Sequence, residues 1–349
     1  GEGNKIQSLN GSGTLELFLS KSILTSGLSG KDDEFSGVIS GDGGFTKVGI
    51  GTSTFSGEKN TYTGATIVQS GVLDIQNPTA LGSVSGETSI EAGASMQLSL
   101  TGTKNSNGIY QEIAFNEPLV INSGKIIFPG NKTPKGDSSD DLGSRIGLKG
   151  PIQIFERATF ETSILQTRDD GNRQAMVSAT VSGEGDFQKT GEGSLLLRDA
   201  DFRGFTGNFF VTEGLLALGQ DYVIPAVSNV AISGGAKVTM YSQTMNQSIA
   251  SLTGEGVWVM FYTGQESTIG NDNGENSLNQ FDGRITGSGS LVKDRTNTLE
   301  LSGSNTYTGS TTVESGTLRV TGTLSDSTAV TVASGATYDV ESTATIGSI

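Results

Sequence analysis

The chain has 349 residues, with 51 glycines but only 6 prolines, so its glycine content does not indicate a disordered chain. Its formal charge of −15 disfavours nucleic acid and anionic membranes as partners. Cysteine and histidine are absent, which excludes disulfides, thiolate metal sites and the common Ser-His and Cys-His nucleophile pairs. No apolar run approaches the ~18 residues of a membrane helix, so no direct membrane insertion is expected.

The first residues already belong to a repeating pattern. Residues 6–13 match residues 249–256, which link two of the repeats described next, and residues 346–349 match the start of that link. We therefore expect the chain to be a fragment with further turns on both sides in a longer parent.

Three segments align on a shared lysine, at Lys47, Lys189 and Lys293. Each segment contains an alternating strand, a Gly-x-Gly turn and the start of a second strand, and each continues into a corner followed by strand, glycine turn and strand. The corner reads Asn-Thr-Tyr-Thr-Gly at residues 60–64 and 305–309, and is reduced to Phe-Thr-Gly at residues 205–207. The repeat units cover residues 35–98, 177–240 and 281–340.

Short strands punctuated by glycine cannot bury an apolar face alone, but coiled around one axis they share a continuous interior. Alternation along the strands directs one set of leucines inward: Leu195, Leu197, Leu299 and Leu301. With roughly 20–25 residues per turn, about 14–17 turns would make a rod of roughly 70 Å. We predict an all-β parallel β-solenoid over residues 1–349; tandem β-sandwiches, the rival fold, would require longer strands.

Residues 99–176 form an irregular, loop-bearing section in this interpretation. Strands are still expected at residues 119–128, 152–155 and 158–160, whereas residues 131–144 and 166–174 are polar. Residues 264–280, rich in Asn and Gly, are a third expected loop. Loops that project from a regular scaffold often carry binding, although neutral surface insertions are the alternative.

Four carboxylate clusters could support glycoside hydrolysis or hold Ca²⁺. They are Asp32 with Asp33 and Glu34, Asp137 with Asp140 and Asp141, Asp169 with Asp170, and Asp272 with Glu275. All lie in Gly/Ser/Asn-rich turns, where Asp is favoured for local hydrogen bonding. We therefore assign no catalytic, metal or cofactor-binding residue, and expect no cofactor.

Aromatic residues fall into core and surface sets. Residues 257–262 align with residues 14–19, which places Trp258, Met260 and Tyr262 in phase with inward leucines. Phe18 and Phe261 are out of phase, so we expect them to be exposed and to mark a contact patch. Tyr62 and Tyr307 are expected to cover the Asn-Thr-Tyr-Thr-Gly corners.

The combined pattern at residues 287–293, 305–311 and 315–318 resembles the passenger-associated transport repeat of autotransporters, the type V secreted proteins of Gram-negative bacteria. The resemblance covers three segments and about half of the chain. It implies a right-handed parallel β-helix at the cell surface or secreted, exported through a C-terminal outer-membrane barrel expected in the parent chain.

The leading functional hypothesis is a non-catalytic adhesin or stalk segment. Its expected partners are a host or matrix protein or glycan receptor, or copies of the same chain; nucleic acid is not among them. The alternatives are a pure spacer or transport-assisting region and, from another class, a polysaccharide-active β-helix enzyme, which would require converging carboxylates in a groove.

Overall fold

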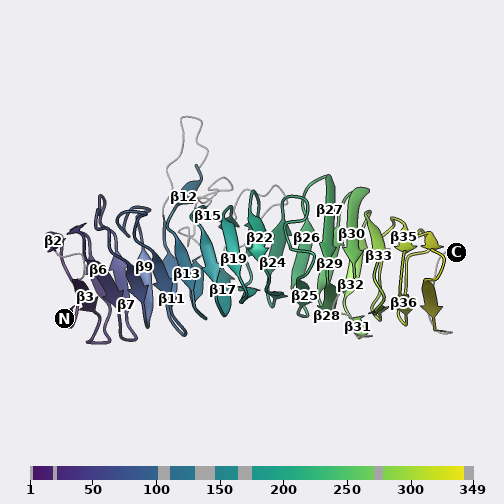
Figure 1. The fold of residues 1–349 in the computed structure, drawn as a ribbon, viewed down its shortest axis with the longest axis horizontal. Helices are drawn as coiled ribbons and strands as arrows, with labels where there is room; N and C mark the ends of the chain where they lie inside the picture. Colours follow the sequence, from purple (N-terminus) through teal and green to yellow (C-terminus); the bar gives the residue numbers. More distant parts are fainter. Residues whose placement is uncertain are drawn as a thin grey trace, which may run out of the picture. The chain divides into compact units, whose positions relative to one another are not determined.

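A computed structural model describes residues 3–18, 22–100, 111–129, 146–163, 175–270 and 278–341. These residues form an all-β parallel solenoid of about 13 turns, and no helix occurs among them. Within the described ranges, therefore, no helix is present that could cross a membrane. The chain divides into two compact units, Gly1–Asp186 and Phe187–Ile349. In each unit, successive coils stack their short strands side by side (Figure 1).

The first unit stacks its strands into parallel sheets, one strand per coil. One sheet contains β1 (Asn4–Lys5), β3 (Ile23–Ser26), β6 (Gly44–Lys47), β8 (Thr66–Val68), β10 (Thr88–Ile90), β13 (Leu119–Ile121), β16 (Ile152–Ile154) and β19 (Thr180–Gly183). A second contains β4 (Asp33–Phe35), β7 (Thr52–Phe55), β9 (Val72–Ile75), β11 (Ser95–Leu98), β14 (Lys125–Phe128) and β17 (Arg157–Thr162). The remaining strands are β2 (Thr14–Leu17) paired with β5 (Val38–Gly41), and the row β12 (Ile113–Phe115), β15 (Ile146–Leu148) and β18 (Ala175–Val177).

The second unit has three such sheets. One contains β20 (Asp186–Thr190), β23 (Phe209–Val211), β25 (Asn229–Ile232), β28 (Ser251–Gly254), β31 (Leu278–Phe281), β34 (Thr298–Leu301), β36 (Thr317–Val320) and β38 (Thr337–Val340). Another contains β21 (Ser194–Leu197), β24 (Leu215–Leu218), β26 (Lys237–Met240), β29 (Val257–Met260) and β32 (Arg284–Gly287). The third contains β27 (Thr244–Ile249), β30 (Gly264–Ile269), β33 (Ser290–Lys293), β35 (Thr311–Val313) and β37 (Val330–Val332), while β22 (Asp201–Phe205) precedes β23.

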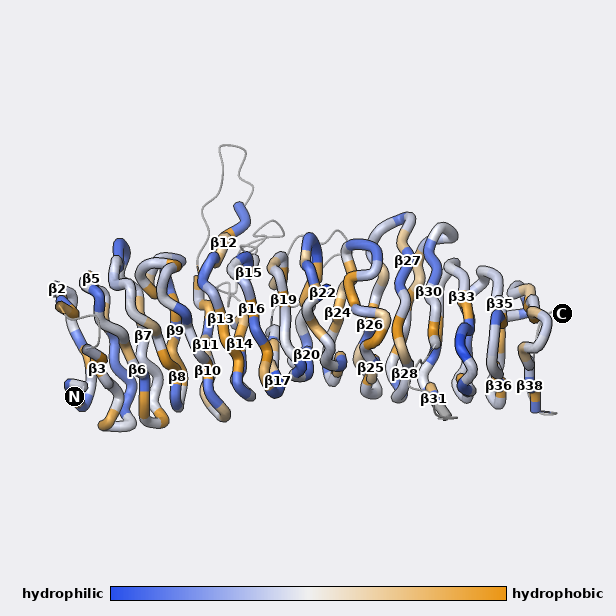
Figure 2. The backbone as a smooth tube through the Cα atoms, viewed as in Figure 1, coloured by the Kyte–Doolittle hydropathy of each residue, from blue (hydrophilic) through white to orange (hydrophobic). Residues whose placement is uncertain are grey.

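The core consists of columns of inward side chains held in register from coil to coil. In the first unit one fully buried column is Leu73, Met96, Ile126 and Phe160. In the second unit another is Leu216, Val238, Trp258 and Ile285. Figure 2 shows hydrophobic stretches recurring along successive coils of each unit. The inward positions predicted for Leu195, Leu197, Leu299 and Leu301 are confirmed, because all four are buried.

Coil length explains why about 13 turns are found and not the predicted 14–17. A regular coil separates Asn60 from its partner Ala80 by 20 residues. The coil between Glu91 and Asn122 spans 31 residues, and the one between Ser123 and Glu156 spans 33. The strands expected at residues 119–128, 152–155 and 158–160 are nevertheless present as β13, β14, β16 and β17, in register with their neighbours.

The first position of the Gly-x-Gly turn requires glycine, because its backbone has a positive φ and lies close to the preceding coil. Gly183 and Gly287 have φ angles of 113° and 104°, in the region that L side chains rarely adopt. A Cβ on Gly287 would also lie 1.9 Å from the Met260 carbonyl oxygen of the preceding coil. Close backbone approach between coils therefore demands glycine at this corner.

Two sequence-based expectations are wrong. Tyr262 is 43% exposed, because β29 ends at Met260 and the chain turns before alternation reaches Tyr262. Residues 264–280 are not one loop, since they include strands β30 and β31. The inward residues of β30 include the buried Gln265 and Ser267, whose polarity concealed the strand pattern. The loops expected at residues 131–144 and 166–174 lie outside the described residues.

Candidate functional site

The lysine shared by the three repeats is buried at every copy, with at most 1% exposure. Its ammonium group donates to three backbone carbonyls, two in the turn that follows it and one in the next coil. The acceptors are Val48, Gly49 and Ser70 for Lys47, Thr190, Gly191 and Glu213 for Lys189, and Asp294, Arg295 and Ser315 for Lys293. Burial lowers the pKa of Lys47, and it lowers that of Lys293 to about 8. The repeat lysine is therefore a clamp between coils and not a surface group.

The Asn-Thr-Tyr-Thr-Gly corners are structural, as predicted. The hydroxyls of the buried Tyr62 and Tyr307 lie 2.6 Å from the hydroxyl oxygens of Thr66 and Thr311. Asn60 accepts the amide of Ile39 at 2.7 Å and donates to a carbonyl of the following coil. Burial raises the pKa of both tyrosines, so they remain protonated hydrogen-bonding groups.

The carboxylates of the first predicted cluster bind the backbone and a side chain of neighbouring coils. Asp32 accepts the amide of Thr52 at 2.7 Å, and the buried Asp33 accepts that of Leu9 at 3.0 Å. Glu34 accepts the hydroxyl of Ser56. Asp33 and Glu34 lie in strand β4, and all three carboxylates bind groups 20 to 24 residues away, so they link coils and do not make the local turn hydrogen bonds that the composition favoured. The clusters at Asp137, Asp140 and Asp141, at Asp169 and Asp170, and at Asp272 and Glu275 lie outside the described residues.

Glu117 is a buried carboxyl group that the sequence did not single out. The Thr88 hydroxyl donates to its Oε1 at 2.7 Å, and burial raises its pKa from an ordinary 4.5 to about 7. The pKa of Glu117 is higher in the folded protein than in the unfolded chain, so the folded state binds this proton more tightly. The resulting contribution to the free energy of unfolding is complete below about pH 4.5. That contribution is lost as the pH rises through about 7.

We therefore predict that the free energy of unfolding depends less on pH in Glu117→Gln than in the wild type. The free energy of unfolding of the wild type, minus that of the variant, should fall by on the order of 2 kcal/mol between pH 4.5 and pH 8. Urea denaturation at a series of pH values measures this difference. Glu87→Gln, at an exposed position one coil earlier, is the control; an equal pH-dependent difference for both variants would contradict the assignment to Glu117.

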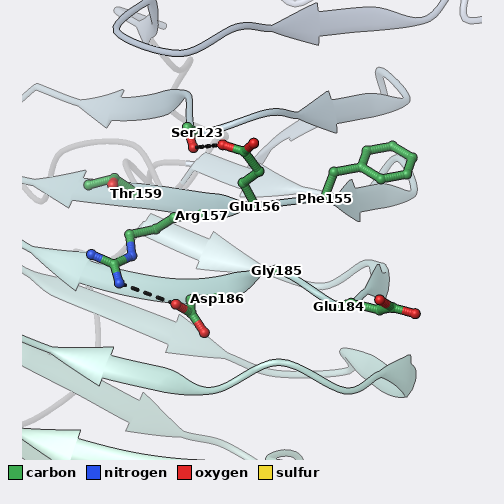
Figure 3. A pocket seen from close by; sticks show the side chains of 8 residues that line it. All are labelled: Ser123, Phe155, Glu156, Arg157, Thr159, Glu184, Gly185 and Asp186. Carbon is green, nitrogen blue, oxygen red and sulfur yellow. Dashed lines mark hydrogen bonds and ion pairs between the residues drawn. The ribbon is translucent and has the colours of Figure 1, made fainter.

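A first hollow lies on the corners of three successive coils in the first unit (Figure 3). It has a volume of about 480 Å³ and is lined by Ser123, Phe155, Glu156, Arg157, Thr159, Glu184, Gly185 and Asp186. Arg157 reaches Asp186 at 3.2 Å, and the Ser123 hydroxyl donates to Glu156. Phe155 is 54% exposed, and its ring points away from the Arg157–Asp186 pair (Figure 3). The hollow thus combines an aromatic ring with charged hydrogen-bonding groups.

A second hollow, of about 550 Å³, lies within the second unit. Its lining is Asp199, Ala200, Asp201, Phe202, Arg203, Gln220, Asp221, Tyr222 and Pro225. Arg203 binds both carboxylate oxygens of Asp201, at 2.9 and 2.7 Å, and these hydrogen bonds lower the pKa of Asp201 to about 2. Tyr222 is 60% exposed, with its amide hydrogen-bonded to the Asn246 carbonyl of the next coil.

Three exposed aromatic residues gather at one corner of the second unit, which we call the aromatic corner: Tyr241, Phe261 and Tyr262. Met240 pairs with Met260, so Tyr241 and Phe261 follow at equivalent positions in adjacent coils. The rings of Phe261 and Tyr262 meet edge to face at 6.4 Å. Phe261 is 54% exposed, and Phe18 in the first unit is 74% exposed, so both predicted surface positions are confirmed.

Sequence reasoning missed both hollows because their members come from different coils. Ile154 pairs with Gly183, which places Phe155 beside Glu184 although 28 residues of chain intervene. The first hollow is formed by the corners that follow β13, β16 and β19. These corners can be recognised as neighbours only when the register of the three strands is known. The exposure of Phe261, which belongs to the aromatic corner, was predicted from the sequence.

The fold and these surfaces define a repeat-built parallel β-solenoid with exposed aromatic and charged side chains at its corners. Residues 45–75 and 291–320 match the model of the passenger-associated transport repeat. The chain is 27% identical over 315 residues, or 90% of its length, to the adhesin BmaC autotransporter of Brucella suis biovar 1 (strain 1330), of which it spans 8%. No solved structure matches the chain. The repeats and this similarity indicate an autotransporter passenger region.

Proposed function

We propose that this chain is a non-catalytic segment of a cell-surface autotransporter passenger and that it supports adhesion. Its partner would be a host or matrix protein or glycan, or a second copy of the chain. The observation that carries the proposal is the aromatic corner, where Tyr241, Phe261 and Tyr262 leave aromatic surface exposed on adjacent coils. Exposed aromatic residues in a contiguous patch are typical of contact surfaces. The similarity to a protein named as an adhesin supports the same function.

A polysaccharide-cleaving function has less support. Such an enzyme needs two carboxylates at a set separation beside a groove. The described members of the predicted clusters instead bind backbone amides and a hydroxyl of neighbouring coils, as Asp32 and Asp33 do. A pure spacer is the other alternative, and it differs from an adhesive segment in having no surface on which binding depends.

Immobilised matrix proteins, a glycan array and the chain itself provide the test. The wild-type chain should bind at least one of these surfaces, and the double variant F261S/Y262S should weaken that binding by at least about tenfold. Ile50→Ser, at an exposed apolar position in the first unit, is the matched control and should bind as the wild type does. Failure to bind any surface would reduce the chain to a spacer, and equal binding by all variants would remove the aromatic corner from the proposal.

A further inference from the structure

We propose that the two hollows are saccharide-binding subsites, each of which takes one ring of a neutral glycan. The inference rests on the proposed function, since it names a receptor class for an adhesive segment. It concerns surfaces other than the aromatic corner, so the two proposals can fail separately. Each hollow is lined by residues of one unit alone.

The two hollows share one chemical composition. Each contains an exposed aromatic ring, Phe155 in the first and Tyr222 in the second. Each contains an Arg–Asp ion pair, Arg157 with Asp186 at 3.2 Å and Arg203 with Asp201 at 2.7 Å. Each also contains two further carboxylates, which are Glu156 and Glu184 in the first hollow, and Asp199 and Asp221 in the second. The recurrence of this set in unrelated stretches of sequence argues against chance exposure of one ring.

This composition fits a sugar ring. A pyranose has an apolar C–H face that packs against an aromatic ring, and a rim of hydroxyls that both donate and accept hydrogen bonds. Carboxylates accept from hydroxyls, while a guanidinium donates, and hydrogen bonds to charged groups are stronger than neutral ones. The bidentate contact with Asp201 fixes the plane of the Arg203 guanidinium, whose side chain is 90% exposed. The pair therefore presents oriented donors and acceptors beside Tyr222.

The backbone at these hollows is held in unusual conformations. Five non-glycine residues have positive φ among those that the structure describes, and three of them line the hollows: Ser123 at 57°, Asp199 at 56° and Tyr222 at 48°. Such conformations cost free energy and cluster where a protein positions groups for function. At Tyr222 the strain is maintained by the hydrogen bond from its amide to Asn246. The ring is thus presented to solvent from a fixed backbone.

The charge of each hollow selects among glycans. Three carboxylates and one arginine leave each hollow net negative, which disfavours sialylated, sulfated and uronic acid residues. The carboxylates do not form an alternative metal site, because in the described part of the chain no three acidic groups are arranged to hold an ion. A neutral hexose or N-acetylhexosamine is therefore the class that satisfies both the ring and the polar groups.

The test measures binding of neutral tetrasaccharides to the full chain by saturation-transfer NMR. The probes are cellotetraose, mannotetraose and the N-acetylglucosamine tetramer, with the cationic glucosamine tetramer for comparison. At least one neutral probe should bind, with an affinity that does not change between low salt and about 0.5 M NaCl. F155A and Y222A should each reduce the transferred signal, and the F155A/Y222A double variant should abolish it.

A control variant shows whether the saccharide signal comes from the hollows. Ile50→Ala removes exposed apolar surface outside both hollows and outside the aromatic corner, and it should retain the full signal. Absence of binding by all neutral probes would overturn the inference, and so would a signal that survives in the F155A/Y222A chain. Preference for the glucosamine tetramer, lost at high salt, would overturn the neutral class, because the hollows would then attract cations. Adhesion that persists without saccharide binding would leave the proposed function intact and refute only the subsites.

Discussion

Replacing Trp258 with alanine is expected to reduce the free energy of unfolding by about 4 kcal/mol. Trp258 is buried in the column between Val238 and Ile285, so truncation leaves a cavity that the rigid coils on either side cannot close. The indole Nε1 also donates to the buried Ser267 hydroxyl at 2.9 Å, and that partner would be lost. Urea denaturation followed by far-UV circular dichroism measures the change, since the variant has no tryptophan fluorescence.

Phe261→Ala is the matched control for Trp258→Ala. It removes an aromatic ring three residues further along the chain, just after the end of β29, where the side chain is exposed. We expect its effect on the free energy of unfolding to stay within about 0.5 kcal/mol. Similar losses for the two variants would mean that the interior of the solenoid does not depend on the Trp258 column.

The second large effect is expected from Lys293→Met. The substitution keeps an apolar side chain of similar length but removes the ammonium, so the carbonyls of Asp294, Arg295 and Ser315 lose their buried donor. We expect a loss of about 3 kcal/mol in the free energy of unfolding, because three part-buried carbonyls would lose their hydrogen bonds to a charged donor. The same denaturation experiment measures it.

Lys237→Met makes the same chemical change at an exposed position of β26 in the same unit. Its effect should remain within about 0.5 kcal/mol. If Lys293→Met were as stable as the wild type, Lys293 would not act as a clamp between coils. That result would imply that water replaces the ammonium at the three carbonyls.

The sequence predicted the solenoid because its determinants are local. Glycine at turn positions such as Gly183 and the alternation in strands such as residues 298–301 are visible without any knowledge of neighbours in space. The burial of Lys293 was not predictable in this way. A lysine at the end of a strand ordinarily reaches solvent, and only the position of Ser315, 22 residues further along, shows that carbonyls replace water.

Register between coils is the property that the sequence did not reveal. Lys189 and Lys293 occupy the same position in their repeats, yet β20 belongs to the sheet of β34 whereas β33 belongs to the sheet of β27 and β30. Coil length varies along the chain, as the 31- and 33-residue coils of the first unit show, so the position of a strand within a repeat does not fix the sheet to which it belongs. The hollows depend on this register, so Phe155 and Glu184 could not be paired from sequence alone.

The parallel register of neighbouring coils is the central claim, and cysteine pairs test it most directly because the chain contains no cysteine of its own. Ile67 and Ser89 are registered partners on β8 and β10, and adjacent parallel strands lie about 4.8 Å apart, within the Cα separation of a disulfide. Thr46 and Ser89 lie two coils apart and exceed that separation. Under mild oxidation, I67C/S89C should form an intramolecular disulfide and T46C/S89C should not. Cross-linking of the second pair, or none in the first, would contradict the solenoid register.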